Sequence, residues 1–115
     1  MLLKRITRWF RHLIFGSSGK QSLKYDFKIV KEFPQYPEEK VFYIEGDIDK
    51  NDFWYGQMKC PCGCNDILTL NLIDDVRPYW SFHVIDNNVS LAPSVWRTKN
   101  CKSHFWLKDG VIKWV

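Results

Sequence analysis

The chain has 115 residues, enough for one compact domain, and its 45% apolar and 17% aromatic content indicates a packed core rather than disorder. No apolar run approaches the roughly 20 residues that a membrane-spanning helix needs, so the sequence predicts no transmembrane segment. The net charge of +4 arises at the N-terminus: residues 1–24 hold six basic residues and no acidic one, which leaves 11 basic against 13 acidic residues beyond them. The overall charge is therefore no argument for nucleic-acid binding.

Residues 1–15 have the pattern of a basic amphipathic helix, followed by a linker over residues 16–24 that is rich in glycine and serine. Apolar residues recur every three or four positions, and arginines interrupt the run that a secretory signal would need. The helix suits an anionic membrane surface, the groove of a partner protein or packing on the body, and the sequence does not choose among them. We expect a cytoplasmic protein, with peripheral membrane attachment as one role of this helix. The residues that would make the contact are Lys4, Arg5, Arg8, Trp9, Phe10 and Arg11.

From residue 25 to residue 115 the apolar period changes to two, which is typical of β-strands. Short alternating segments follow one another, separated by turn residues such as Asp86-Asn87-Asn88 and Asp109-Gly110. The predicted fold class is all-β: a small antiparallel meander, rolled into a sandwich or a partial barrel, that forms one domain over residues 25–115.

The four cysteines are the strongest chemical signal in this domain. Cys60, Cys62 and Cys64 alternate with proline and glycine, and Cys101 is followed three positions later by His104. Two short turns that each carry soft ligands are typical of a structural zinc site. Five candidates compete for four positions, so we expect one zinc ion held by three cysteines and His104, and the spacing does not show which clustered cysteine is spare. The alternative is a set of free cysteines in the core.

A catalytic zinc ion needs a coordination position open to water, and five candidate ligands leave no vacancy. The motifs of zinc-dependent deaminases and of His-Glu-x-x-His proteases are absent from the sequence. A nucleophilic Cys101, paired with His104 or His83, is the remaining catalytic option. The sequence therefore predicts no catalytic residue.

Three segments resemble a family of small, uncharacterised bacterial zinc-binding proteins. They are the cysteine triplet at 60–64, the segment Leu91-Ala92-Pro93-Ser94-Val95-Trp96, and the segment Cys101-Lys102-Ser103-His104-Phe105-Trp106. The resemblance covers roughly residues 37–115, and Asn65 stands where the family often has glycine. Some members are encoded near ubiquitin-like conjugation or phage-defence genes, which implies a partner-binding or accessory role.

The function expected from the sequence is a non-enzymatic, zinc-stabilised binding module or adaptor, accessory to a bacterial ubiquitin-like or defence pathway, whose partner is another protein. A second hypothesis is a nucleic-acid-binding zinc domain, because aromatic and basic residues can combine base stacking with phosphate contacts. The residues proposed for binding are Trp96, Arg97, Lys102 and Trp106. A third hypothesis is a hydrolase that depends on zinc or on a cysteine.

Overall fold

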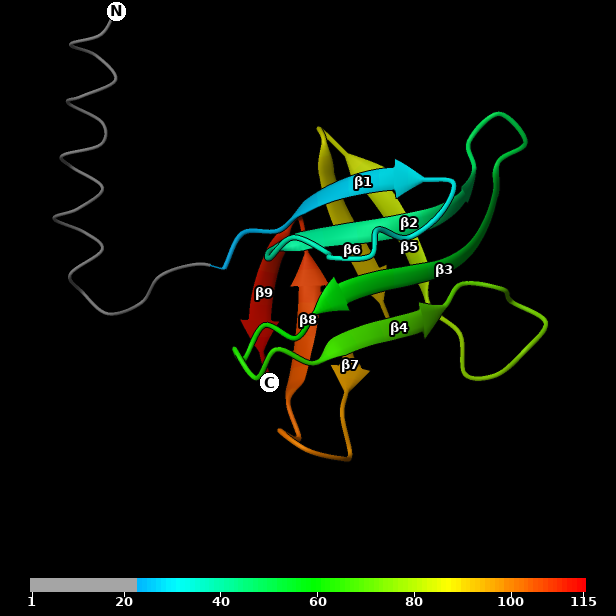
Figure 1. Cartoon of the computed structure of the whole chain (residues 1–115). Coiled ribbons are helices and arrows are strands. Elements are labelled where there is room, and N and C mark those ends of the chain that lie inside the picture. Colours follow the sequence, from blue (N-terminus) through cyan, green and yellow to red (C-terminus); the bar gives the residue numbers. More distant parts are fainter. Residues whose placement is uncertain (1–22) are drawn as a thin grey trace, which may run out of the picture.

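A computed structural model describes residues 23–115, and the predicted helix over 1–15 and most of the predicted linker lie outside this part of the chain. The nine strands are β1 (Asp26–Val30), β2 (Val41–Asp47), β3 (Asp52–Lys59), β4 (Ile67–Asn71), β5 (Ser81–Ile85), β6 (Asn88–Ala92), β7 (Val95–Trp96), β8 (His104–Lys108) and β9 (Val111–Trp114). They form three small sheets in the orders β1-β2-β3-β4, β5-β6 and β7-β8-β9 (Figure 1). The predicted all-β class is confirmed for these residues.

Of the two predicted forms, a sandwich or a partial barrel, the partial barrel is wrong, and so is the predicted antiparallel pairing of the first two strands. The described residues form three separate sheets rather than a barrel, and the first strand pair is parallel, with Asp26 opposite Val41 and Val30 opposite Glu45. The pair is parallel because residues 31–40 carry the chain back along β1 before β2 begins, whereas a tight hairpin would reverse its direction. The remaining pairs are antiparallel.

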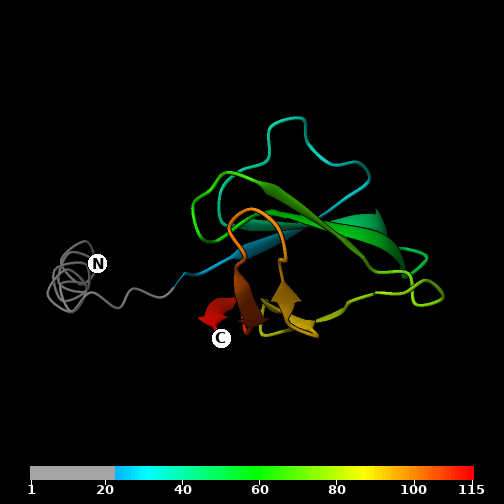
Figure 2. The ribbon, with the colours of Figure 1, turned by 90° about the horizontal axis from the view of Figure 1, so that it is seen from below.

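The sheets are arranged in two layers, with the four-stranded sheet above the other two in Figure 2. The core lies between the layers. From the four-stranded sheet it takes Phe42, Ile44, Met58, Leu68 and Leu70, and from the other layer Val89, Leu91, Val95, Phe105, Leu107 and Ile112. Gly56 on β3 has no room for a side chain, because a Cβ atom there would overlap the ring of Phe42.

The predicted hairpins at 86–88 and 109–110 are confirmed. Asp86 and Asn87 both have positive φ between β5 and β6, as do Asp109 and Gly110 between β8 and β9. Positive φ at both central residues fits the right-handed twist of the flanking strands. These two turns therefore set β6 antiparallel to β5 and β9 antiparallel to β8. The site described below lies between β6 and β8 in the chain.

Two loops from different layers meet at one end of the molecule. The turn between β3 and β4 carries residues 60–66, and the loop between β7 and β8 carries residues 97–103. In Figure 2 the orange β7–β8 loop rises from the lower layer toward the four-stranded sheet. Residues 23–115 contain no helix long and apolar enough to span a membrane.

Candidate functional site

A serine and a histidine lie side by side where β7 and β8 begin their pairing. Ser94 directly precedes β7, and His104 is the first residue of β8. Because the two strands are antiparallel with Trp96 opposite His104, Ser94 and His104 come together across the hairpin. The Oγ of Ser94 is 2.9 Å from the Nε2 of His104.

Strand alternation turns this pair away from the core. Val95 and Phe105 are buried, so their neighbours Trp96 and His104 lie on the outward face, and Ser94 and His104 are each half-buried. The pair is therefore within reach of a molecule that approaches from solvent.

The imidazole is held by stacking rather than by a carboxylate. The rings of Trp96 and His104 are nearly parallel, at 14°, with centroids 5.2 Å apart. Within residues 23–115, Ser94 is the one side chain that hydrogen-bonds to the imidazole. The serine segment is fixed in turn by Trp80, whose indole Nε1 donates to the carbonyl oxygen of Ser94 at 3.3 Å.

A hydroxyl in hydrogen-bond contact with an imidazole is the arrangement of an activated nucleophile. When the ring proton is on Nδ1, the lone pair of Nε2 can take the proton of the Ser94 hydroxyl as that oxygen attacks an electrophile. The observed separation of 2.9 Å lies within the range that such a transfer requires.

The four cysteines form a second cluster, at the meeting point of the two loops. The sulfur atoms of Cys60, Cys62, Cys64 and Cys101 all lie within 4.8 Å of one another. Cys60 is 3.5 Å from both Cys62 and Cys101. Four sulfur atoms on a tetrahedron with Zn–S bonds of about 2.3 Å would be roughly 3.8 Å apart, so the cluster has the size of a metal site.

The turn that carries three of these cysteines is built as the sequence predicts. Gly63 and Asn65 both have positive φ, which glycine and asparagine tolerate better than other residues. The backbone of Cys60 closes the turn, since its N–H donates to the carbonyl of Asp66 at 2.8 Å and its carbonyl accepts from the N–H of Gly63. The backbone of the turn is therefore closed by hydrogen bonds within residues 60–66.

Polar groups from the β7–β8 loop surround the sulfur atoms. Nη1 of Arg97 is 3.1 Å from the sulfur of Cys101 and 3.6 Å from that of Cys64, while Nη2 pairs with the carboxylate of Asp66 at 3.0 Å. The hydroxyl of Ser103 is 3.1 Å from the sulfur of Cys101. Four thiolates around a divalent cation carry a net charge of −2, and Arg97 lies where it offsets part of that charge.

The local environment gives the thiols of Cys60 and Cys101 different pKa values. Burial raises the pKa of Cys60 to about 12. The hydrogen bond from Ser103 is the main cause that lowers the pKa of Cys101 to about 6. Cys101 therefore ionises far more readily than Cys60 when no metal is bound.

The structure separates His104 from the cysteines with which the sequence analysis grouped it. The four-sulfur cluster does not include His104, whose Nε2 faces Ser94 instead. Among the residues proposed for binding, Trp96 is 67% exposed and Trp106 is half-buried on the same outward face. Lys102 is exposed, whereas Arg97 is turned toward the thiols and Asp66.

In a comparison with known protein families, the model of the BubE family, bacterial ubiquitination-like system serine protease, matches residues 29–115. The chain belongs to this family. The expected tie to ubiquitin-like conjugation systems is thereby confirmed for the BubE family. The expectation of a non-enzymatic adaptor is wrong, because the family is one of serine proteases. Comparisons with curated proteins and with solved structures give no match.

Sequence reasoning missed Ser94. The residue lies in one of the segments on which the family resemblance rested, yet it received no chemical role. Sequence reasoning grouped His104 with the cysteines as a zinc ligand and considered only Cys101 as a nucleophile. The available signal was the position of the two residues, which lie at either end of a short segment between predicted strands.

Proposed function

We propose that this BubE protein is a serine hydrolase that cleaves peptide or isopeptide bonds within a bacterial ubiquitination-like system, with Ser94 as nucleophile and His104 as general base. The observation that carries the proposal is the contact of 2.9 Å between the Ser94 hydroxyl and Nε2 of His104. The family description agrees with this chemistry. Among the described residues the pair has no acidic third member, so it acts as a dyad.

The reaction follows from the two groups. The Ser94 oxygen attacks the carbonyl carbon of the scissile bond while its proton passes to Nε2 of His104. His104 returns that proton to the departing amine, which leaves an ester between Ser94 and the acyl part of the substrate. Water then loses a proton to His104 and hydrolyses the ester, which restores both side chains.

We propose a structural role for the metal that the four cysteines would hold, with zinc as the ion that best fits four sulfur ligands. Cys60, Cys62 and Cys64 would anchor the turn of the four-stranded sheet to Cys101 in the β7–β8 loop. That loop joins the segment of Ser94 to the strand of His104, so the metal would hold the two catalytic residues in register.

Labelling with a small fluorophosphonate tests the proposed nucleophile. We expect one covalent adduct per chain, located on Ser94 by peptide mass spectrometry, because only an activated serine reacts rapidly with this reagent. Ser94→Ala should remove the label, and His104→Gln should slow it by about 100-fold or more. Thr69→Ala is the matched control, since it removes an exposed hydroxyl of β4 and should leave labelling unchanged. An adduct at another residue, or none in the wild type, would overturn the proposal.

Trp96 provides a separate test of how the imidazole is positioned. Trp96→Ala removes the ring stacked on His104, so we expect kcat for an activated ester to fall by roughly 10-fold, with KM nearly unchanged, because a poorly oriented base loses part of its effect. Trp96→Phe should restore most of the rate. Because Trp96 is 67% exposed, neither substitution should lower thermal stability much. Equal rates in all three proteins would show that stacking does not orient the base.

A further inference from the structure

An apolar groove opens beside the proposed catalytic pair. It has a volume of about 820 Å³, and its wall includes Ala92 and Pro93, the two residues that precede Ser94. The lining also includes Trp106, which lies two positions after His104 on the same face of β8. The groove therefore borders the chain segments that carry both Ser94 and His104.

The lining of the groove defines the chemistry of its occupant. Pro78, Tyr79, Pro93 and Trp106 offer rings, and Ala92 adds a methyl group. Rings of this kind favour contact with an apolar side chain over contact with a charged one. The residues that form the wall include no carboxylate.

One cation, Arg77, lines the groove, and a second, Lys108, lies over the ring of Trp106. The guanidinium carbon of Arg77 is 5.6 Å from the centroid of the Tyr79 ring. Nζ of Lys108 is 4.7 Å from the centroid of the Trp106 ring. An acidic group on the occupant, next to its apolar side chain, would meet favourable charge at the rim.

We infer that this groove is the substrate-binding subsite of the Ser94–His104 centre, that it receives an apolar side chain of the polypeptide to be cleaved, and that Trp106 is its specificity-determining residue. The inference rests on the proposed function. It goes further by assigning the chemical class of the residue recognised: apolar, with an acidic neighbour toward Arg77 and Lys108.

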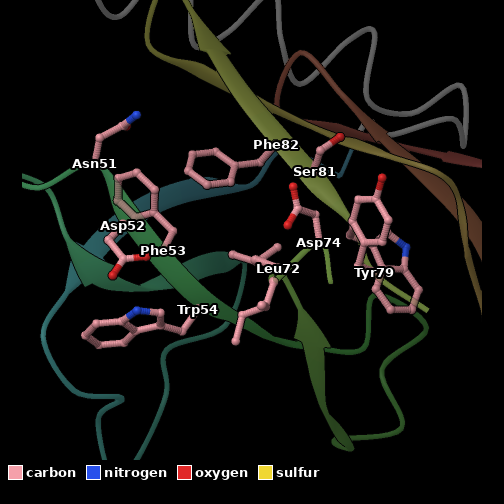
Figure 3. A pocket seen from close by; sticks show the side chains of 11 residues that line it. Asn51, Asp52, Phe53, Trp54, Leu72, Asp74, Tyr79, Ser81 and Phe82 are labelled. Atoms are coloured by element: carbon pink, nitrogen blue, oxygen red, sulfur yellow. The ribbon is translucent and has the colours of Figure 1, made fainter. Parts of the chain in front are cut away.

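A second hollow, of about 570 Å³, shares Tyr79 and Ser81 with the groove but has the opposite character. Figure 3 shows the carboxylates of Asp52 and Asp74 at this hollow, with the indole of Trp54 on one side of it. Its wall contains no basic residue, so it suits a cationic group better than the occupant inferred here. Recognition in the groove therefore favours an acidic substrate group, whereas recognition in the second hollow favours a cationic one.

The inference is tested with fluorophosphonates that share one reactive group and differ in their tail. The second-order rate constant of Ser94 labelling is measured for a methyl, an aromatic, a carboxylate-ended and an ammonium-ended tail. We expect the aromatic tail to react about 10- to 100-fold faster than the methyl tail, the range that apolar pockets give. The carboxylate-ended tail should react faster than the ammonium-ended one, and Lys108→Glu should reduce this difference.

Trp106→Ala should abolish the advantage of the aromatic tail while the methyl reagent still labels Ser94, and Trp106→Phe should restore part of the advantage. Trp54→Ala is the matched control, because it removes a tryptophan from the wall of the other hollow. Equal rates for the aromatic and methyl tails, or an advantage that survives Trp106→Ala, would overturn the subsite but leave the nucleophile intact. A preference for the ammonium tail that is lost in Trp54→Ala would place recognition in the other hollow. Failure of every reagent to label Ser94 would instead overturn the proposed function, and the subsite with it.

Discussion

Ser94→Ala is expected to lower kcat for hydrolysis of p-nitrophenyl acetate to the rate of the reaction without enzyme, a loss on the order of 10³- to 10⁶-fold. The reason is that the substitution removes the attacking oxygen and leaves the imidazole of His104 without a nucleophile to activate. Ser94 is half-buried and lies outside the core, so the protein should keep its circular dichroism spectrum and its melting temperature within a few degrees. The measurement is the initial rate of nitrophenolate release at equal protein concentration.

The double variant separates catalysis from general damage to the site. Because Ser94 and His104 act as one unit, Ser94→Ala combined with His104→Gln should be no slower than Ser94→Ala alone. Thr69→Ala, which removes an exposed hydroxyl from β4, should hydrolyse the ester at the wild-type rate. Losses that multiply in the double variant would mean that the two residues contribute independently, and a serine–histidine mechanism would then be wrong.

The all-β fold class could be predicted because strands and hairpins are specified by residues that lie close together in the sequence. Alternating apolar residues and turns built from asparagine, aspartate and glycine specify strands and hairpins through contacts between near neighbours. The parallel pairing of β1 with β2 could not be predicted in this way, because it depends on how residues 31–40 lie over the molecule. Alternation also failed on β2, where Val41, Phe42, Tyr43 and Ile44 are all buried. This part of β2 carries apolar side chains on both faces, so the sequence does not show the alternation of apolar and polar residues that marks a strand.

The cysteine cluster was predictable for a similar reason: three of its four cysteines lie within residues 60–64, and two short turns that each carry soft ligands are typical of a metal site. The contact between Ser94 and His104 was not, because serine and histidine have many roles and their meeting depends on the register of one short hairpin. Spacing alone placed Cys101 and His104 together as metal ligands. In the structure, Cys101 contacts the other sulfur atoms and His104 faces Ser94. A loop that curls toward the four-stranded sheet separates two residues only three positions apart.

Removal of the proposed metal is expected to lower the free energy of unfolding substantially. The sulfur atoms of Cys62 and Cys64 belong to exposed residues, so they contribute little to core packing. Cys62→Ser should therefore cost almost nothing unless the sulfur holds a metal. With a metal bound, we expect a loss of a few kcal/mol, or a fall in melting temperature of about 10–20 °C. A strong chelator added to the wild type should have the same effect, and zinc should reverse it.

Cys62→His is the matched control, because histidine can also bind zinc and should retain part of the stability that serine loses. Zinc-edge X-ray absorption identifies the ligands directly: we expect one zinc ion with four sulfur neighbours in the wild type. A zinc ion with three sulfur neighbours and one nitrogen neighbour would indicate that His104 is a ligand, as the sequence predicted. Ser94 would then lack its proposed base. No metal, and no change in stability on chelation, would contradict a structural metal centre.

Loss of the proposed metal should also impair the proposed Ser94–His104 pair, since both depend on the β7–β8 loop. Arg97 connects the two: its backbone N–H donates to the carbonyl of Ser103 at 2.7 Å, and its guanidinium contacts the sulfur of Cys101. Ser103 is the residue before His104, so a loop released from the metal can shift the imidazole directly. We therefore expect the rate of Ser94 labelling to fall about 10-fold or more in Cys62→Ser even below its melting temperature, where the strands remain paired. Labelling at the wild-type rate in metal-free, folded protein would show that the hairpin alone holds Ser94 against His104, and that the metal supports the fold without supporting the site.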